Sequence, residues 1–275
     1  MTEAQRVPPG VDPDTPSPAR LYDYYLGGTD NFPADRDAAE RIRARIPELA
    51  DAAWANRGFH QRTALWLAAS RGIRQFIDIG SGLPTQNNTH QAVQKAAPDA
   101  RVVYVDHDPM VRAYASALLT GDGTTRFAAA DLRDPERVLT DPGTRELIDF
   151  SQPAGLLMTA VLHFVADGSD PRGLVARYLA ALAPGSYLAL SHVTADQKPP
   201  AAVRVLLDTY DRATEQLYPR TRAEVERFFG GLELVPPYEG AAAAVTYVGE
   251  WGAEDPELAD SDGSRWSYGA VARRP

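Results

Sequence analysis

An acidic side chain and two glycines stand together in the run Phe76-Ile77-Asp78-Ile79-Gly80-Ser81-Gly82-Leu83. The apolar residues predict a buried strand, and the glycines predict a tight turn into a helix. Because glycine lacks a Cβ, the main-chain N–H groups of such a turn can approach a ligand closely. Asp78 adds a carboxylate at the end of the strand, which suits a ligand with an ammonium group. Alone, this pattern also occurs in ordinary strand–helix turns.

Two further carboxylates follow the next two predicted strands. Asp106 comes directly after the β-branched run Arg101–Val105, and Asp131 follows the run Arg126–Ala130. A carboxylate at the tip of the second strand of a βαβ unit can accept hydrogen bonds from both ribose hydroxyls. Asp131 stands where a side chain can accept from an adenine amino group. The three acidic residues at consecutive strand ends therefore predict one shared nucleoside ligand.

Two kinds of nucleoside ligand compete for these carboxylates. A dinucleotide such as NAD requires Gly-x-Gly-x-x-Gly after the strand. Thr85 occupies the third glycine position here, and Pro84 precedes it. Asp78 would also place negative charge beside a diphosphate. S-adenosylmethionine has no phosphate and carries an ammonium group, so these residues favour it over a dinucleotide.

On these motifs the chain resembles the class I S-adenosylmethionine-dependent methyltransferases. The matching segments are Asp78–Gly82 (first motif), Asp106 (second motif), Asp131 and Leu132 (adenine-contacting position), Leu156–Phe164 (fourth strand and the segment after it) and Leu182–Ser186 (turn into the fifth strand). Ser186 stands where that family usually has a second glycine. The resemblance implies a Rossmann-like α/β fold with a seven-stranded, mostly parallel sheet whose last strand is antiparallel.

A narrower resemblance spans nearly the whole chain. The chain is similar to an actinobacterial S-adenosyl methyltransferase family formerly described as a domain of unknown function. The segments that carry this resemblance are Ala19–Gly28, Asn31-Phe32, Asp35-Arg36, Gly82–Thr85 and Asn88–His90. The resemblance implies a methyl donor and names no acceptor.

The candidate donor contacts follow from these motifs. Gly80 and Gly82 would allow close backbone approach, and Ser81 would contribute its backbone more than its hydroxyl. Asp78 is the candidate partner of the methionine ammonium group, directly or through water, and Asp106 is that of the ribose hydroxyls. These positions fall at the carboxyl ends of predicted strands, where open α/β sheets bind their ligands.

Other candidate contacts allow two interpretations each. Thr159 ends the fourth predicted strand and is a candidate donor contact. His107 would cover the adenine, or it is a solvated loop histidine. Thr85 or Asn88 would bind the methionine carboxylate at a helix N-terminus, where the dipole favours an anion. Alternatively, Thr85 or Asn87 only caps that helix.

The tyrosine-rich segment Tyr22–Asn31 is a candidate lid over the donor. Tyr22 and Gly28 would then contact the donor, whose sulfonium charge can interact with aromatic faces. The alternative is that Tyr22 and Tyr25 are half-buried anchors of a helix that stops at Gly27-Gly28. Both interpretations remain open on the sequence.

His163 is the candidate catalytic residue, because it follows the fourth strand near the expected position of the acceptor. It would act as general base for a hydroxyl or amine nucleophile, or it is structural. His192 is a weaker rival for this role. His60 and His90 fall within predicted helices and are assigned structural roles. No residue spacing indicates a metal site.

Composition excludes several functions. The 275 residues are 44% hydrophobic, which suffices for one large core. The absence of cysteine excludes disulfides, thiolate metal sites and an iron–sulfur cluster. The 37 acidic and 28 basic residues give a net charge of −9, which disfavours a nucleic-acid partner. No run of residues suits a membrane span or a signal peptide, so we expect a cytoplasmic protein without a membrane partner.

Three regions are predicted along the chain: an extended or disordered tail over 1–18, an N-terminal helical cap over 19–72, and a Rossmann-like domain over 73–275. Ser17-Pro18 predicts a helix start, and Thr221–Glu224 predicts a capping box. Longer helices are predicted over Pro33–Ile46, Pro47–Arg71 and Pro199–Leu217. The predicted strands are Gln75–Ile79, Arg101–Val105, Thr125–Ala129, Gly155–Ala160, Tyr187–Ser191, Leu232–Val235 and Ser267–Ala272.

These observations favour an S-adenosylmethionine-dependent methyltransferase with a small-molecule acceptor. Methyl transfer from a sulfonium depends mainly on positioning and desolvation, so the acceptor leaves little trace in the sequence. The resemblance suggests a secondary metabolite, methylated at oxygen or nitrogen. The alternatives are a non-catalytic S-adenosylmethionine-binding protein and, with less support, an NAD-dependent oxidoreductase. The oligomeric state does not follow from the sequence.

Overall fold

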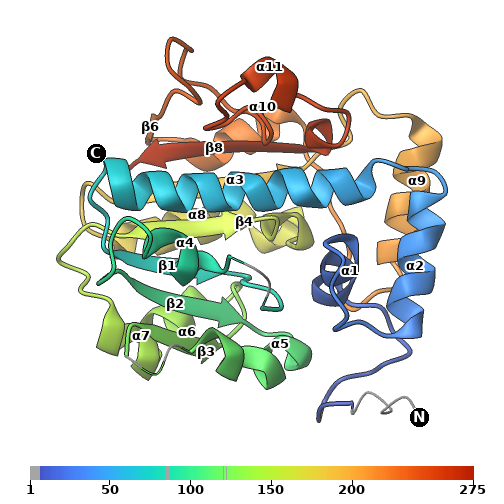
Figure 1. Cartoon of the computed structure of the whole chain (residues 1–275), viewed down its shortest axis with the longest axis horizontal. Coiled ribbons are helices and arrows are strands. Elements are labelled where there is room, and N and C mark those ends of the chain that lie inside the picture. The colour runs from blue at the N-terminus through green and yellow to red at the C-terminus, as the bar shows by residue number, and fades with distance from the viewer. Residues whose placement is uncertain (1–6, 85–86, 120, 122) are drawn as a thin grey trace.

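The computed structural model describes residues 7–84, 87–119, 121 and 123–275, and within these ranges its centre is one eight-stranded sheet (Figure 1). The strands are β1 (Gln75–Ile79), β2 (Arg101–Asp106), β3 (Thr125–Ala129), β4 (Gly155–Thr159), β5 (Tyr187–Val193), β6 (Glu233–Leu234), β7 (Thr246–Tyr247) and β8 (Ser267–Arg273). Their order is β3-β2-β1-β4-β5-β8-β6, with β7 paired to β8 beside this path.

The strand directions confirm the predicted Rossmann-like methyltransferase fold. β1 to β5 pair in parallel, and β8 runs antiparallel to β5, β6 and β7. β1 lies between β2 and β4, so the strand order reverses there and opens a crevice at the carboxyl ends. The two-residue strand β7 was not predicted.

The helices are α1 (Pro18–Tyr25), α2 (Pro33–Arg43), α3 (Leu49–Ser70), α4 (Thr89–Val93), α5 (Pro109–Tyr114), α6 (Pro135–Thr140), α7 (Pro142–Leu147), α8 (Pro171–Ala181), α9 (Pro200–Tyr210), α10 (Arg222–Glu226) and α11 (Pro256–Ala259). Several begin with a proline behind a capping side chain. Ser17 accepts from the Arg20 N–H at α1, and Asp108 accepts from the Met110 N–H at α5. Proline is favoured at this position because the first N–H groups of a helix have no partner inside it.

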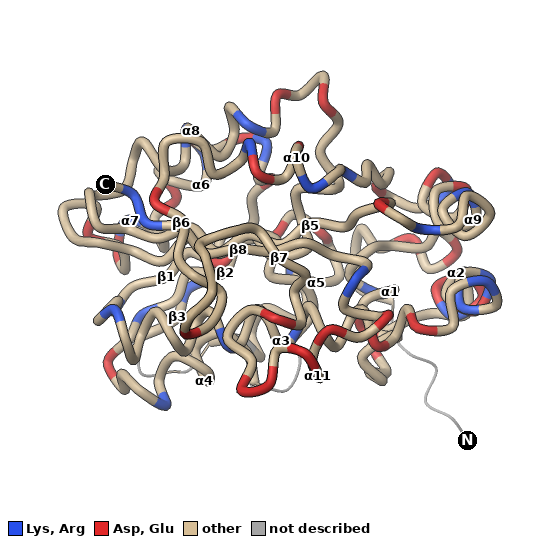
Figure 2. Tube along the Cα trace, turned by 90° about the horizontal axis from the view of Figure 1, so that it is seen from above, with Lys and Arg blue, Asp and Glu red and all other residues tan. Residues whose placement is uncertain are grey.

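Helices cover both faces of the sheet (Figure 2). α3 and α4 lie on one face, where Phe59 and Leu67 of α3 pack with Phe76 and Val102 of the sheet. α6, α7, α8 and α10 lie on the other face. There Val138, Leu147, Leu174 and Val225 join strand residues in one core. The sheet is therefore buried on both sides, which explains its nearly continuous apolar strands.

A third group of helices lies beyond the carboxyl ends of the parallel strands. α1, α2 and α9 stand there side by side (Figures 1 and 2). Leu21, Ile42 and Leu206 give these helices a small core of their own, with Trp266 beside them. The predicted N-terminal cap thus consists of two parts, because α1 and α2 pack with α9 whereas α3 packs on the sheet. Residues 7–17 form neither helix nor strand.

Within the described part of the chain, no helix is both long and apolar enough to cross a bilayer.

Candidate functional site

A cavity opens at the carboxyl ends of β1, β2 and β4. Its walls come from four parts of the chain: α1, α3, the sheet with the turns that follow its strands, and α9 with the loop after it. The predicted donor contacts that line it are Tyr22, Asp78, Gly80, Ser81, Gly82, Asp106, His107, Leu132 and Thr159. The fold therefore brings these residues together as the sequence predicts. Their roles stay predictions.

The glycine turn after β1 is tied to β2. Gly80 and Gly82 have φ values of 70° and 67°, which favour glycine. A Cβ at Gly80 would lie 2.3 Å from Val161 Cγ2, so a side chain there would clash. The Gly80 and Ser81 amides donate to the Val105 carbonyl (2.8 and 3.1 Å), and the Gly82 amide donates to Asp106 Oδ2 (2.9 Å). These amides thus shape the turn and do not face a ligand as the sequence suggested.

The Asp106 carboxylate holds the glycine turn in place and can also accept hydrogen bonds from a ligand. Its Oδ2 accepts from the Gly82 amide, and its Oδ1 accepts from the Asp108 amide (2.9 Å). Each carboxylate oxygen can accept a second hydrogen bond. Burial raises the pKa of this carboxyl group. A pair of ribose hydroxyls would supply the further hydrogen bonds that stabilise its charge.

A hydrogen-bond chain runs from Asp78 to the cavity wall. The Thr89 hydroxyl donates to Asp78 Oδ2 (2.6 Å), His60 Nε2 lies 2.8 Å from Thr89 Oγ1, and His60 Nδ1 lies 2.8 Å from Thr159 Oγ1. Burial lowers the pKa of His60 to about 3, so its ring is neutral. Burial raises the pKa of Asp78 to about 6, against the opposing effect of the Thr89 hydrogen bond.

The direction of every bond in this chain follows from counting hydrogens. Thr89 has one hydroxyl hydrogen and gives it to Asp78, so His60 must donate to Thr89 through Nε2. His60 Nδ1 then has no hydrogen and accepts from the Thr159 hydroxyl. Thr159 consequently presents lone pairs, and no hydrogen, to the cavity. Its side chain can bind only a ligand group that donates a hydrogen bond.

Sequence reasoning missed His60, which it assigned to a structural role inside a helix. The residue stands on α3, and its partner Thr159 ends β4, 99 residues later. Asn56 and Arg57 line the cavity from the same helix. No local pattern in α3 indicates which of its side chains reach the site, because the packing of α3 on the sheet decides this. The other predicted structural histidine, His90, does not line the cavity.

A charged cluster stands on the β2 and β3 side of the cavity. His107 Nε2 lies 3.1 Å from Glu215 Oε1, and Arg133 pairs with the other oxygen of Glu215. The hydrogen bond to Glu215 raises the pKa of His107. Glu215 comes from the loop after α9, 108 residues from His107, and was not predicted. His107 is thus paired with a carboxylate while its side chain is 42% exposed, and both interpretations, adenine cover and solvated loop histidine, are compatible with its contacts.

Two predicted donor contacts, Asp131 and Gly28, lie outside the cavity lining. Asp131 turns toward its own chain, accepting from the Arg133 amide (2.8 Å) and pairing with the Arg133 guanidinium (3.2 Å), while its neighbour Leu132 reaches the cavity. Gly28 packs against Asp23, where a Cβ would lie 2.0 Å from the carboxylate. Thr85 lies outside the described residues.

His163, the predicted general base, also lies outside the cavity lining. It is 3% exposed, and its Nδ1 accepts from the Val193 amide (3.3 Å). Burial, with further contributions from His192 and the positive charge of Arg220, lowers its pKa well below the usual value. The ring packs against Phe164, which does line the cavity. His163 is therefore buried behind Phe164, and the proposed site does not include it.

The N-terminal segment contributes a rigid wall. The Tyr22 hydroxyl donates to the Ala53 carbonyl (3.0 Å) and accepts from Asn56 (2.9 Å). Tyr22 is thus anchored to α3 while its side chain lines the cavity. Both interpretations of this residue, anchor and cover, are therefore compatible with its contacts.

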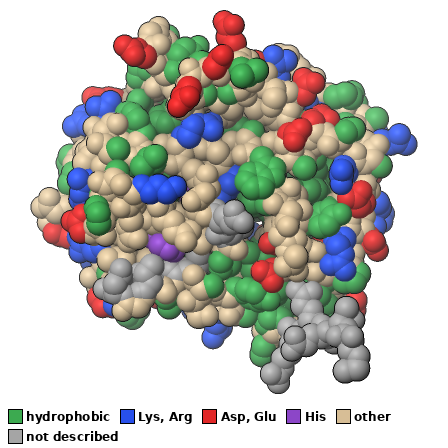
Figure 3. All heavy atoms as spheres, in the orientation of Figure 1, with side chains coloured by type: hydrophobic (Ala, Val, Ile, Leu, Met, Phe, Trp, Pro, Cys, Tyr) green, Lys and Arg blue, Asp and Glu red, His purple; other side chains and the backbone are tan. Residues whose placement is uncertain are grey.

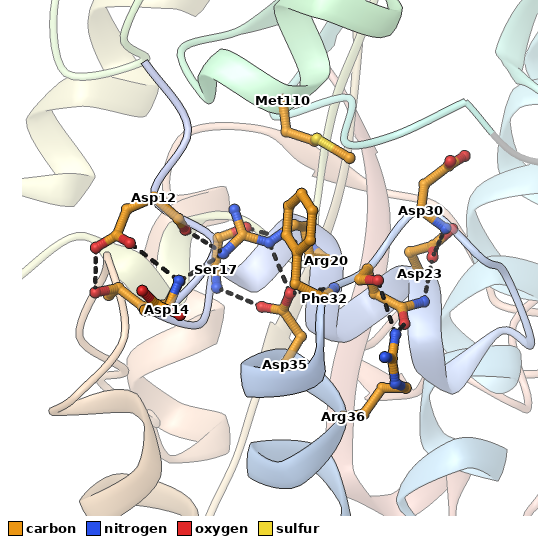
Figure 4. Close-up of polar contacts among 12 residues, drawn as sticks. Asp12, Asp14, Ser17, Arg20, Asp23, Asp30, Phe32, Asp35, Arg36 and Met110 are labelled. Atoms are coloured by element: carbon orange, nitrogen blue, oxygen red, sulfur yellow. Dashed lines mark hydrogen bonds and ion pairs between the residues drawn. The ribbon is translucent and has the colours of Figure 1, made fainter. Parts of the chain in front are cut away.

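Hydrogen bonds to Asp35 hold this wall in place (Figure 4). They come from Ser17, Arg20 and Phe32. The buried carboxylate of Asp35 accepts from Arg20 Nε (2.7 Å) and from the Ser17 and Phe32 amides (3.0 and 2.8 Å). Beside them, Asn31 donates to Asp23 (2.8 Å). The N-terminal residues that carried the narrow resemblance thus join α1 to α2, and they hold Tyr22 and Asp23 at the cavity.

A family model described as S-adenosyl methyltransferase matches residues 4–275. The chain belongs to the S-adenosyl methyltransferase family. This methyltransferase is similar to a putative methyltransferase from Thermobifida fusca YX, with 41% identity, 97% of each chain covered and a TM-score of 0.87. It is also similar to a DUF574 family protein from Streptomyces avermitilis MA-4680, with 41% identity, 96% of this chain and 99% of the other covered, and a TM-score of 0.89. A search of curated proteins found no match.

The chemistry of the cavity fits the family's methyl donor, S-adenosylmethionine. Asp78 and Asp106 offer carboxylates to the ammonium and hydroxyl groups of this molecule, and a Cβ at Gly82 would meet no atom within 4 Å, so this part of the turn leaves open space for a ligand. The described residues contain no cluster of side chains that could hold a metal ion.

Proposed function

We propose that this methyltransferase transfers the methyl group of S-adenosylmethionine to an oxygen or nitrogen atom of a small molecule. Secondary metabolites are the first acceptor class to examine. The observation that supports this proposal most is the composition of the cavity walls. One side holds the glycine turn with Asp78 and Asp106, and the other holds aromatic side chains from separate elements.

The donor side of the cavity supplies groups for each part of S-adenosylmethionine. In the proposal, Asp106 accepts from the ribose hydroxyls, and Asp78 stabilises the ammonium group. Leu132 and His107 flank the adenine, in place of the Asp131 carboxylate suggested by the sequence. The Gly80 turn allows the donor to lie against the strand ends.

The acceptor side is bounded by Tyr22, Phe164 and Tyr210. Phe164 and Tyr210 lie with their ring centroids 5.8 Å apart, so the two side chains form a continuous aromatic wall. Such a wall excludes water and orients a flat or apolar molecule. Its rings come from three separate elements, α1, α9 and the segment after β4.

Methyl transfer from a sulfonium needs little covalent participation by the protein. When bound, the donor supplies an electrophilic methyl group on its sulfonium. The chain has to orient the acceptor in line with that group and to keep water out. Thr159 presents lone pairs to the cavity, so we assign it the role of accepting a hydrogen bond from the acceptor's O–H or N–H group.

The charge of the chain supports a small-molecule acceptor over nucleic acid. The net charge is −9. On the face drawn in Figure 3, acidic and basic side chains are interspersed and no continuous basic patch forms. Nucleic acids require concentrated positive charge, since phosphate neutralisation supplies much of their affinity.

Calorimetry with S-adenosylmethionine, S-adenosylhomocysteine and NAD tests the donor assignment. We expect binding of the first two ligands and none of NAD. A panel of small phenols, amines and carboxylic acids is then screened for release of S-adenosylhomocysteine. Release with a member of the panel supports catalysis, and tight donor binding without release from any class of acceptor would favour a non-catalytic binding protein.

A further inference from the structure

The two ends of the cavity differ in what they offer a bound donor. On the proposed function, Asp106 and Leu132 fix the nucleoside end at β2 and the turn after β3. The methionine end of the donor then lies toward Asp78 and α3. That end carries an ammonium group and a carboxylate. Asp78 can stabilise the ammonium, but the carboxylate needs N–H donors or a cation.

The main-chain amides of the glycine turn do not meet this need. Gly80 and Ser81 donate to Val105, and Gly82 donates to Asp106. Each N–H group has one hydrogen, which is directed at β2 in all three residues. The amides of Gly80, Ser81 and Gly82 therefore have no hydrogen left for an anion.

The main-chain amides at the start of the next helix, α4, also have hydrogen-bond partners. α4 has only five residues, and Asn88 and Gln91 form a capping box at its start. The Asn88 amide donates to Gln91 Oε1 (2.7 Å), and the His90 amide donates to the Tyr104 hydroxyl (2.9 Å). The helix cap is thus Asn88, and not Asn87 as the capping interpretation had it. A carboxylate would have to displace these partners to bind there.

Arg57 stands at the methionine end. It lines the cavity from α3, one turn before His60. Its positive charge acts to lower the pKa values of Asp78 and His60, which places the guanidinium in electrostatic reach of both. Its Nη2 donates to the Asn87 carbonyl (3.0 Å), and this bond holds the side chain beside the loop between β1 and α4.

The other arginine that lines the described part of the cavity belongs to the nucleoside end. Arg133 pairs with Asp131 and with Glu215, which also contacts His107. Its charge is compensated by these carboxylates and lies beside the turn after β3. The two guanidinium groups therefore differ in position: Arg133 lies at the nucleoside end of the cavity and Arg57 at the methionine end.

We propose that Arg57 binds the carboxylate of the donor's methionine part, opposite the ammonium partner Asp78. The planar guanidinium can donate two parallel hydrogen bonds to a carboxylate, which a lysine cannot. Arg57 and Asp78 together recognise the amino-acid end of the donor as a pair of opposite charges. The N-terminal helix α3 is thereby part of the donor site, although the sequence placed it in a separate cap.

Calorimetry with two natural ligands tests this role. S-adenosylhomocysteine carries the amino-acid end, and 5′-methylthioadenosine lacks it. In the Arg57→Met protein we expect affinity for S-adenosylhomocysteine to fall about 10- to 100-fold, the usual range for a hydrogen bond to a charged group. Affinity for 5′-methylthioadenosine should stay within about twofold of wild type, since Arg57 does not contact the nucleoside in this proposal.

Arg41→Met, an exposed charge loss on α2, is the matched control and should change neither affinity. Equal losses for both ligands in Arg57→Met would overturn the proposal, as would an unchanged affinity for S-adenosylhomocysteine. The wild-type protein gives a second test that needs no variant: decarboxylated S-adenosylmethionine should bind at least tenfold more weakly than S-adenosylmethionine. Equal binding of the two contradicts the role of Arg57, whereas failure of wild type to bind any of these nucleosides contradicts the proposed function itself.

Discussion

Single side chains set the charge and hydrogen-bond polarity of this site. Asp78, Thr89, His60 and Thr159 form one chain in which each hydrogen has a defined direction. The chain ends on a carboxylate that is 4% exposed. A buried charge of this kind is costly unless its hydrogen bonds are complete. The polarity of Thr159 in the cavity is therefore a consequence of the ionisation of Asp78.

The tautomer of His60 is the first testable consequence. Because burial lowers its pKa to about 3, the ring should stay neutral between pH 5 and pH 8. At pH 7, where Asp78 is ionised, its hydrogen should be on Nε2. Two-bond ¹H–¹⁵N NMR distinguishes this tautomer from the Nδ1–H form and from the imidazolium. His107 is the internal control, since its pKa is raised and its ring should be more fully protonated than that of His60 at the same pH. A hydrogen on Nδ1 of His60 at pH 7 would reverse the direction of the whole chain.

The ionisation of Asp78 should make donor binding depend on pH. Burial raises its pKa to about 6, so the carboxylate that stabilises the ammonium group is lost as pH falls through 6. We expect the affinity for S-adenosylhomocysteine to fall about tenfold between pH 7 and pH 5, in line with one titrating group. In Asp78→Asn the affinity should be lower at pH 7 and nearly independent of pH. Calorimetry at both pH values checks this, and a wild-type affinity that does not change would rule Asp78 out as the ammonium partner.

The same group acts on stability with the opposite sign. Its pKa in the folded protein exceeds the usual value of 3.8, so between about pH 4 and 6 the folded state binds more protons than the unfolded state. The unliganded protein therefore loses stability as pH rises through this window. A bound ammonium group offsets that loss, which links the donor to the stability of the fold.

At the scale of elements, the segment after β4 depends on one buried arginine. Arg220 donates to the Leu162 and Val165 carbonyls (3.1 and 2.7 Å) and to His192 Nε2 (2.8 Å). Its partner Asp167 has a side chain that is 86% exposed, so the ion pair between them contributes little to the free energy of unfolding. The carbonyl bonds hold the segment that carries Phe164 into the cavity wall.

Removal of this arginine should destabilise the fold. In Arg220→Met the two carbonyls lose their buried donor, and we expect the free energy of unfolding to fall by about 2–4 kcal/mol. Arg222→Met is the control, because its guanidinium is exposed and pairs with Glu226 on the same helix. That variant should change stability by at most about 0.5 kcal/mol. Urea unfolding of both proteins measures the difference, and equal effects would show that the Arg220 contacts do not support the segment.

The elements that sequence reasoning predicted well are those with local signals. Ser17 and Thr221 cap α1 and α10 as predicted, because capping depends on residues three positions apart. The β-branched runs at β1 and β2 likewise form where predicted. β7 was missed because its two residues are held in place by β8, which lies beyond it in the chain. The predicted helix after the glycine turn begins only at Thr89, since the capping box at Asn88 sets its start.

At the scale of the molecule, the residues of the candidate site also fall into two groups. Some have a local sequence signal, and others reach the cavity through tertiary packing alone. Asp78 and Asp106 were predicted because each ends a strand, and the parallel sheet brings strand ends together. His60 and Glu215 were missed because tertiary packing alone brings them to the cavity from distant parts of the chain. Their bonds to Thr159 and His107 span 99 and 108 residues. Strand-end patterns therefore predicted Asp78 and Asp106, whereas His60 and Glu215 follow from the fold alone.

This assembly from distant segments predicts how ligand binding spreads through the molecule. α1, the glycine turn and the loop over 211–220 all contribute residues to the cavity walls. Saturating S-adenosylhomocysteine should therefore slow amide hydrogen exchange in all three segments together, because a ligand stabilises each element that it contacts. α11 contributes nothing to the described cavity and is the internal control, expected to exchange at an unchanged rate. At 100 times its Kd the ligand should also add about 2.7 kcal/mol to the free energy of unfolding. Protection limited to the glycine turn would mean that the donor leaves α1 and the 211–220 loop uncovered, and these two segments would then serve only the acceptor.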